Sequence, residues 1–378
     1  MKAHTLILLT LAVLAASILI GLDVSRQQVP AAAPPITETH TITNASQETA
    51  WFKLGQAYRD GDGVAKDEAE AVKWFRKAAE QGNAPAQNSL GVMYDNGTGV
   101  TKDEAEAAKW YRKAAEQGLS KAQVNLGECY YYGTGVTKDE AEAAKWFRKA
   151  AEQGLDKAQA SLGSCYYYGR GVEKDPVEAV KWFRKAAEQG LAYAQNALGA
   201  MYGNGTGVTK DEAEAVKWYR KAAEQGHDYA QNNLGVMYDN GTGVTKDEAE
   251  AAKWFRKAAE QGHDYAQNNL GIKYLNGTGV AKDYAEAVKW FRKAAEQGHA
   301  GGQENLGNCF RLGNGIPKNE VEAYALLNLA GASLEGSRWA RDQLERTLSR
   351  DEIAAGQRRS REIQKEIEDK QRNLVAVP

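Results

Sequence analysis

Residues 86–118 read AQNSLGVMYDNGTGVTKDEAEAAKWYRKAAEQG, and close copies of this stretch recur along most of the 378-residue chain. The copies are 36 residues apart, as their tryptophans show: Trp74, Trp110, Trp146, Trp182, Trp218, Trp254 and Trp290. A constant period of this length indicates one supersecondary unit repeated in tandem. We count eight consecutive copies between residues 47 and 337.

Each copy predicts two helices joined by a glycine-rich turn. In the quoted stretch, Ala86, Leu90 and Tyr94 recur with the period of a short helix that has one buried stripe. A glycine-rich segment then breaks that helix. Asp103, with Glu106 three residues later, has the form of a capping box and predicts the start of a second helix, which the last glycine of the stretch ends.

The residues of both helices predict close packing. In the second helix, Trp110 and Tyr111 share one face with the small side chains of Ala107 and Ala114. Gly91 lies inside the first helix and recurs in later copies, although a helical glycine costs about 1 kcal/mol relative to alanine. We therefore expect a tight contact at this glycine. Because one such hairpin cannot bury its own apolar face, we expect an all-α solenoid of stacked hairpins.

The unit resembles the repeat of the Sel1-like repeat family, a relative of the tetratricopeptide repeat. The resemblance covers roughly residues 50–337 and rests on these residues of the second copy: Ala86, Leu90-Gly91, Tyr94, Gly97-Thr98-Gly99-Val100, Asp103, Ala107, Trp110, Ala114-Ala115 and Gly118. It implies a right-handed alpha-alpha superhelical solenoid that serves as an adaptor or scaffold, often in bacterial envelopes and signalling. It implies no cofactor and no common catalytic residue.

The eighth copy departs from this pattern in the manner of a capping unit. Leu326 stands at the tryptophan position, Phe310 at the tyrosine position, and Asn319 replaces the capping aspartate. Residues 338–378 show two further helical patterns with many charges, and we expect them to be C-terminal capping helices and a tail that close the open end of the solenoid.

Composition excludes several classes of function. The 48 Lys and Arg residues nearly balance the 50 Asp and Glu residues, so a nucleic-acid partner is disfavoured. The three cysteines, Cys129, Cys165 and Cys309, are too few and too far apart for a zinc knuckle or a disulfide framework, and we expect small buried free thiols. Residues 95–106 lack the side-chain ligands and the turn of a calcium loop. The sequence thus predicts neither a metal site nor a cofactor.

The N-terminal segment differs from the repeats. Lys2 precedes an almost unbroken apolar run over residues 6–22, so residues 1–22 predict either a signal peptide or an uncleaved membrane anchor. We favour the anchor. Either form places the repeats outside the cytoplasm, on the periplasmic face of the inner membrane or, after cleavage, in the periplasm or medium. Residues 23–46, rich in Pro, Ala and Thr, predict a disordered tether.

The first helix of each copy offers a candidate binding surface. In helical-hairpin solenoids the first helices line the concave wall, and the arc opposite the buried stripe is where the copies differ. From this arc we predict these partner-binding residues: Tyr131, Tyr167, Tyr193, Asn196, Tyr229, Asn232, Val236, Tyr265, Asn268 and Ile272. Tyrosine and asparagine ladders suit an extended polypeptide, while a glycan stacked on the rings, or plain duplication of tolerated residues, remains an alternative.

Histidines also recur in register. His227, His263 and His299 occupy equivalent positions in three neighbouring copies, and Asp228 and Asp264 follow the first two. Duplication alone explains such a series. A metal or proton ladder is the alternative, which we retain as a hypothesis of pH sensitivity.

These observations favour a non-catalytic scaffold that binds a protein or peptide partner on its concave face and meets a membrane only through its N-terminal segment. The repeats contain no Ser, His and Asp grouping with a nucleophile elbow, so a hydrolase has little support. A cell-envelope hydrolase, or a protein that binds glycan or peptidoglycan, is the alternative.

Overall fold

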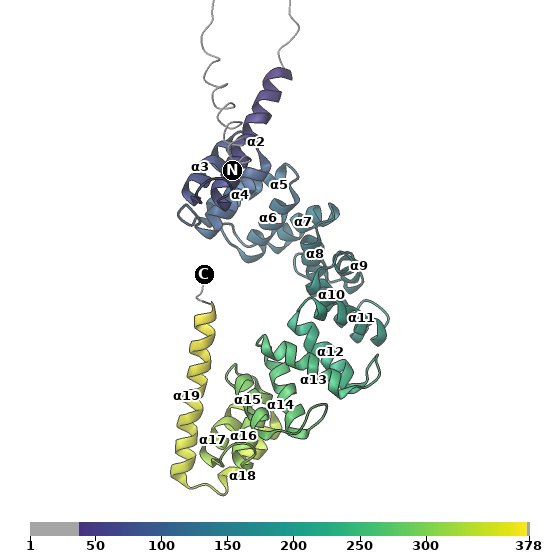
Figure 1. The fold of residues 1–378 in the computed structure, drawn as a ribbon, viewed down its shortest axis with the longest axis vertical. Helices are drawn as coiled ribbons and strands as arrows, with labels where there is room; N and C mark the ends of the chain where they lie inside the picture. The colour runs from purple at the N-terminus through teal and green to yellow at the C-terminus, as the bar shows by residue number, and fades with distance from the viewer. Residues whose placement is uncertain (1–37, 376–378) are drawn as a thin grey trace, which may run out of the picture. The chain divides into compact units, whose positions relative to one another are not determined.

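The computed structural model describes residues 38–375, in which every regular element is an α-helix (Figure 1). The helices divide into two compact units, one that ends at Ala158 and one that begins at Gln159. Within each unit, helices pack on the next helix along the chain, except that the last two helices, α18 and α19, both pack on α17. The predicted all-α architecture of stacked hairpins is therefore confirmed.

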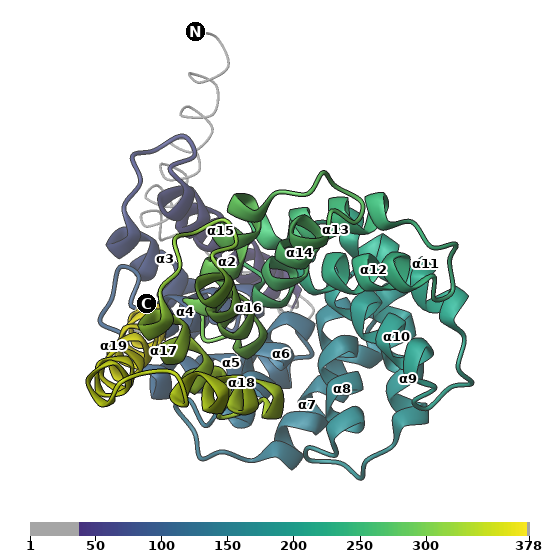
Figure 2. The same cartoon turned by 90° about the horizontal axis from the view of Figure 1, so that it is seen from below.

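The even-numbered helices up to α16 are the first helices of their hairpins, and the odd-numbered helices α3–α17 are the second helices. The first unit contains α2 (Glu38–Asp60), α3 (Glu68–Glu80), α4 (Ala84–Asn96), α5 (Glu104–Glu116), α6 (Ser120–Tyr132) and α7 (Glu140–Glu152). The unit boundary falls inside α8 (Asp156–Tyr168). The second unit contains α9 (Pro176–Glu188), α10 (Ala192–Asn204), α11 (Glu212–Glu224), α12 (Asp228–Asn240), α13 (Glu248–Glu260), α14 (Asp264–Asn276), α15 (Tyr284–Ala295), α16 (Ala300–Leu312), α17 (Glu320–Ala330), α18 (Glu335–Glu345) and α19 (Arg350–Val375). Within this second unit, Figure 2 shows α10, α12 and α14 on the inner side of the curve and α9, α11 and α13 on its outer side.

The second helices begin at the expected aspartates, but only half of each predicted capping box forms. The Asp103 carboxylate accepts a hydrogen bond from the backbone N–H of Glu106 at 2.9 Å. The Asp103 backbone N–H does not bond to Glu106; it donates to the Tyr94 carbonyl at 2.9 Å. The Glu106 carboxylate pairs with Lys109 at 3.0 Å instead. In a full capping box the Glu106 carboxylate would accept the Asp103 backbone N–H. Here the Tyr94 carbonyl of α4 accepts it, because the glycine-rich turn brings the end of α4 beside Asp103.

Glycine is required where the turn of one repeat meets the second helix of the repeat before it. Gly99 has a φ of 66°, and a Cβ at this residue would lie 2.2 Å from the Glu68 carbonyl oxygen. The same contact recurs in the second unit, where Gly243 lies against the Glu212 carbonyl. No other residue fits, because both the backbone conformation and the space exclude a side chain.

The glycine inside each first helix receives an aromatic ring, as predicted. A Cβ on Gly91 would lie 2.7 Å from Cδ1 of Tyr111, and one on Gly235 would lie 2.7 Å from Cδ1 of Phe255. Tyr111 and Phe255 are almost fully buried beside the repeat tryptophans and alanines. The energetic cost of the glycine is therefore offset by burial of a whole ring.

A buried glutamine ladder that the sequence did not reveal links consecutive repeats. The Gln231 side-chain N–H donates to the Ala223 carbonyl of the preceding second helix at 3.1 Å. Its side-chain oxygen accepts from Gln261 at 2.7 Å. These two hydrogen bonds use both the donor and the acceptor of the Gln231 amide, which is only 4% exposed. They also link the end of one hairpin to the end of the next.

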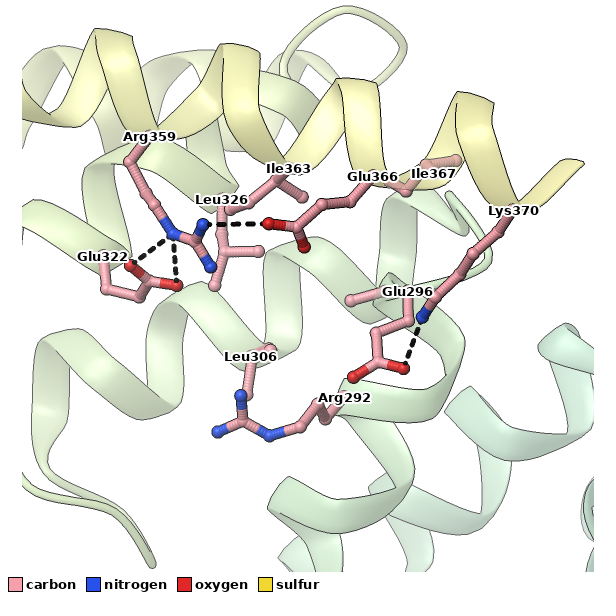
Figure 3. A pocket seen from close by; sticks show the side chains of 11 residues that line it. Arg292, Glu296, Leu306, Glu322, Leu326, Arg359, Ile363, Glu366, Ile367 and Lys370 are labelled. Atoms are coloured by element: carbon pink, nitrogen blue, oxygen red, sulfur yellow. Dashed lines mark hydrogen bonds and ion pairs between the residues drawn. The ribbon is translucent and has the colours of Figure 1, made fainter. Parts of the chain in front are cut away.

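Helix α19 covers the end of the second unit. Its residues Ile363 and Ile367 are buried in the same cluster as Leu326 and Leu327 of α17. Figure 3 shows Arg359 directed at Glu322 of α17, at 3.3 Å, and Lys370 directed at Glu296, at 3.0 Å, around a cavity of about 70 Å³. The apolar end of the last repeat is thus shielded from water.

Helix α2 begins at Glu38, inside the stretch 23–46 that the sequence predicted as a tether. No proline occurs after Pro35 in that stretch, so nothing in it prevents the first helix from extending backward. The rest of the predicted tether and the predicted signal or anchor at residues 1–22 lie outside the described residues. Between residues 38 and 375, no helix is both long enough and apolar enough to cross a bilayer.

A candidate binding surface on the first helices

Three exposed tyrosines mark the first helices of the second unit. Tyr193, Tyr229 and Tyr265 are the second residues of α10, α12 and α14, and they are 47%, 59% and 60% exposed. Their equivalent positions in three successive copies form a row of exposed rings along the first helices. The accessible tyrosine ladder predicted from the sequence is therefore present.

The asparagine ladder differs from the prediction, which placed these side chains on an exposed arc. Asn232 and Asn268 are each only 9% exposed. The Asn232 side-chain oxygen accepts a hydrogen bond from Asn269 at 3.1 Å, and the Asn268 oxygen accepts one from Asn305 at 2.8 Å. Asn196 accepts from Asn233 in the same way at 3.2 Å. Each of these asparagines faces the next first helix, so its amide oxygen joins two repeats.

The remaining predicted residues are less exposed than the three tyrosines and less buried than Asn232 and Asn268. Val236 and Ile272 are partly buried against the core. Tyr131 and Tyr167 are also partly buried, each with its ring edge-on to the following tyrosine, at 4.9 and 4.8 Å between ring centres. Those following tyrosines, Tyr132 and Tyr168, are 70% and 58% exposed. The accessible aromatic surface of these two copies is thus displaced by one residue from the predicted arc.

An aromatic pocket of about 190 Å³ opens beside Tyr193. Its walls are the rings of Tyr167, Tyr168, Phe183 and Tyr193, and its remaining lining residues are Asn196, Ala197, Ala200 and Met201. The Tyr193 hydroxyl lies 3.2 Å from the Ser164 hydroxyl, which holds the ring across the opening. No charged side chain lines this pocket among the described residues. Phe183 comes from a second helix, and no sequence pattern connected it with the tyrosines.

The histidines alternate with the tyrosines in one continuous row. Tyr229 packs edge-on against His263 with 4.6 Å between ring centres, and Tyr265 packs in the same way against His299 at 4.5 Å. His227 begins the row, 6.2 Å from the Tyr229 ring. We call these five residues, His227, Tyr229, His263, Tyr265 and His299, the aromatic row.

Each histidine of the aromatic row caps the first helix that follows it. The Nδ1 atoms of His227, His263 and His299 accept backbone N–H groups at 3.3, 3.2 and 3.0 Å. Burial lowers the pKa of all three imidazoles, and nearby Asp228 and Asp264 oppose this shift. The cap geometry and the lowered pKa both agree with neutral rings that carry their proton on Nε2, because a protonated Nδ1 cannot accept a bond.

Other chemistry considered from the sequence has little structural basis. In the part of the chain that the structure describes, no three His, Cys, Asp or Glu side chains are placed to share a metal ion. The three cysteines are buried without disulfides, and burial raises the pKa of Cys129 and Cys309 to about 11. Thiols of this kind are poor nucleophiles near neutral pH.

Comparisons with known proteins agree with this architecture. A family model described as Sel1 repeat matches eight consecutive segments, residues 50–83, 84–119, 120–155, 156–191, 192–227, 228–263, 264–299 and 300–333. No curated protein matches the chain.

Two crystal structures are similar over most of the chain. A Sel1 repeat protein from Oxalobacter formigenes is 33% identical, with a TM-score of 0.62, and the match covers 87% of this chain and 99% of that one. The protein c5321, a protective antigen of uropathogenic Escherichia coli strains with an SLR fold, is 31% identical with a TM-score of 0.54. That match covers 90% of this chain and 97% of the antigen.

Proposed function

This chain belongs to the Sel1 repeat family, and on that premise we propose that it is a non-catalytic scaffold that binds a polypeptide along the first helices of its second unit. Proteins built from this repeat generally serve protein–protein interaction. The finer statement, that binding occurs at the tyrosines of α10, α12 and α14, is our own.

The observation that carries the proposal is the run of exposed tyrosines on three successive repeats, continuous with an aromatic pocket at Tyr193. Tyrosine contributes a large apolar face and a polar tip at low entropic cost, which suits a peptide ligand. Neighbouring helices pack about 8–10 Å apart, which equals about three residues of extended chain. Side chains three residues apart face opposite sides of a β-strand but the same side of a polyproline II helix, which rises about 3.1 Å per residue. A peptide in the polyproline II conformation would therefore place every third side chain at a tyrosine.

The test is capture of a partner by photocrosslinking in the native cell. A photoreactive residue at Val236, on the same helix as Tyr229, should crosslink a polypeptide in the otherwise wild-type chain. The adduct should disappear when Tyr193, Tyr229 and Tyr265 are all changed to Ala. The matched control changes Tyr284 and Trp339, two exposed aromatic residues outside the first helices, to Ala and should retain the adduct.

If the triple variant keeps its helical circular dichroism and still captures the same species, the tyrosine surface is not the binding site. The crosslinked polypeptide would then bind to another face of the protein, and the proposal that binding occurs at these tyrosines would be wrong.

The aromatic pocket favours one second candidate, a glycan ligand, because sugar rings also stack on aromatic faces. Isothermal titration with soluble peptidoglycan fragments tests it, and a Tyr193→Ala change should abolish any heat of binding. The related hydrolase alternative needs paired carboxyl groups at the bond to be cleaved. No carboxyl group lines the pocket among the described residues.

We also propose that residues 1–22 export the chain and retain it at the membrane, because an apolar run follows Lys2. N-terminal sequencing of the mature protein separates the two forms. A start at Met1 supports an anchor, whereas a start after about residue 17 supports cleavage of a signal peptide.

A further inference from the structure

We infer that the polypeptide bound by the aromatic row is basic, and that its Lys or Arg side chains lie over Tyr229 and Tyr265 beside the carboxylates of Asp228 and Asp264. This inference rests on the proposed function and adds the chemistry of the partner.

The first support is the charge on the three first helices. Among all residues of α10, α12 and α14, only Asp228, Asp239, Asp264 and Lys273 are charged. Lys273 is 6% exposed and pairs with Asp239 of the preceding repeat, so these two charges neutralise each other. The surface therefore retains two carboxylates, Asp228 and Asp264, each adjacent to an exposed tyrosine.

The neighbouring histidines do not neutralise these carboxylates near neutral pH. The His227 Nδ1 atom lies 4.0 Å from the Asp228 carboxylate, a separation at which a charged imidazole would form an ion pair. That same Nδ1 accepts the Ala230 N–H, so it carries no proton and the ring stays neutral. The carboxylate of Asp228 is therefore not paired with a charged histidine.

The second support is that no cation of the described chain covers the tyrosines of the row, whereas two other exposed tyrosines have one. The Tyr168 ring has the Arg170 guanidinium at 5.0 Å, and the Tyr284 ring has the Lys282 ammonium at 4.7 Å. No Lys or Arg of the described chain lies over Tyr229 or Tyr265, although both rings are more than half exposed. An exposed ring beside a carboxylate is the arrangement that attracts an external cation.

The repeats themselves show that the two carboxylates are not needed for folding. The residue equivalent to Asp228 and Asp264 is Ala84, Ser120, Ala192 or Ala300 in four other copies and Asp156 in a fifth, and each of those copies forms the same first helix. Each carboxylate also accepts the backbone N–H of the next residue, at 2.8 Å in both α12 and α14. What distinguishes Asp228 and Asp264 from Asp156 is the exposed tyrosine that follows each of them, where Lys157 follows Asp156. The combination of carboxylate and exposed ring is therefore the feature that we assign to a ligand.

The experiment uses the full chain in mild detergent and a phage-displayed library of random twelve-residue peptides. Selected peptides should be enriched in Lys and Arg relative to the unselected library. The recovered peptides should then bind the Asp228→Asn, Asp264→Asn double variant about tenfold more weakly, and their wild-type affinity should fall as salt rises. The control, Glu173→Gln with Glu335→Gln, removes the same net charge from exposed positions outside the first helices and should bind as wild type does.

Two other outcomes overturn the inference, and they are distinguishable. If peptides are selected without Lys and Arg enrichment, or if the double Asn variant binds them equally well, the partner is not recognised by charge, while the proposed polypeptide binding stands. If no peptide binds better to the wild type than to the Tyr193, Tyr229 and Tyr265 triple Ala variant, the proposed function fails as well.

Discussion

At the scale of single residues, the surroundings of each glycine determine what that glycine contributes. Two glycines inside first helices have different surroundings. Gly235 faces the ring of Phe255, whereas a Cβ on Gly203, also inside a first helix, would meet only the Ala215 methyl group, at 3.7 Å. What surrounds the Cβ position therefore decides whether glycine is required.

We predict opposite effects for alanine at these two glycines. Gly235→Ala places a methyl group 2.7 Å from Phe255 and should destabilise the protein by about 1–3 kcal/mol despite its better helix propensity. Gly203→Ala meets no obstruction and should stabilise it by about 0.5–1 kcal/mol. Urea unfolding monitored by circular dichroism measures both. Equal effects of the two changes would contradict the role assigned to the ring.

We predict that the three histidine caps make the second unit sensitive to acid. Because burial lowers the pKa of His227, His263 and His299 in the folded chain, the unfolded chain binds protons more readily. The stability they provide is present above the unfolded pKa of about 6.5 and is lost as the pH falls through that region. The melting temperature should therefore decrease between about pH 7.5 and about pH 5.5.

Asparagine supplies the control for this pH effect, because Asn83 caps its own helix at the equivalent position, with Oδ1 2.9 Å from the Ala86 nitrogen. Changing all three histidines to Asn should keep the caps and remove most of the pH dependence. The side chains that face the histidines are Asp228, Asp264, Tyr229 and Tyr265, and the Asn variant leaves all four in place. An unchanged pH profile in the Asn variant would assign the effect to other groups.

At the scale of helices, contacts one repeat apart determine how the hairpins stack. The asparagine and glutamine ladders bond across neighbouring repeats, and the turn glycines let one repeat approach the next. Helix α19 replaces the missing next repeat at the C-terminal end of the second unit. Its two buried isoleucines and its ion pairs with Glu322 and Glu296 reproduce what another hairpin would supply.

We predict that breaking the apolar contact of α19 exposes the last repeat. Ile367 is 4% exposed, so Ile367→Glu should cost the end of the unit about 2–4 kcal/mol. Hydrogen exchange should show faster exchange in α16 and α17 and little change in α10. The control, Gln371→Glu, adds the same charge at an exposed position of α19 and should leave exchange unchanged.

If α17 retained full protection in the Ile367→Glu variant, α19 would not act as a cap. Its ion pairs would then be a surface feature of small energetic consequence.

At the scale of the whole molecule, stability arises from repeats that contact mainly their neighbours. Such a chain tolerates a change in the number of its units, provided that the register of the junctions is kept. The cores support this, because each one continues from hairpin to hairpin within its unit.

We predict that deletion of residues 228–263 leaves a folded protein. The deletion joins His227 to Asp264, which recreates the native sequence around His263 and keeps every inter-repeat contact type. The shortened chain should unfold cooperatively with unchanged helix content per residue, and peptide binding should weaken because one tyrosine of the surface is lost. Deletion of residues 228–245 removes a first helix alone and should abolish cooperative unfolding in the second unit.

The sequence by itself determined the helical hairpins, the aspartate caps of the second helices and the repeat family. These features depend on local interactions. An aspartate caps a helix by accepting a backbone N–H three residues later, and a glycine ends a helix in the left-handed conformation. Because the unit recurs every 36 residues, each of these patterns is seen several times in the sequence. Helical periodicity also placed Tyr193, Tyr229 and Tyr265 on an exposed arc, which is correct, but the same arc included Asn232 and Asn268, which are only 9% exposed.

Only the tertiary structure decided which polar and aromatic groups meet across repeats. Asn232 and Asn269 are 37 positions apart, so whether they bond depends on the offset and rotation between neighbouring hairpins. The same geometry places Tyr229 on His263, brings Phe183 into the aromatic pocket and seats α19 on α17. The repeat period shows which residues are equivalent in different copies, but it does not show how far apart their side chains lie, and that distance determines the shape of the candidate binding surface.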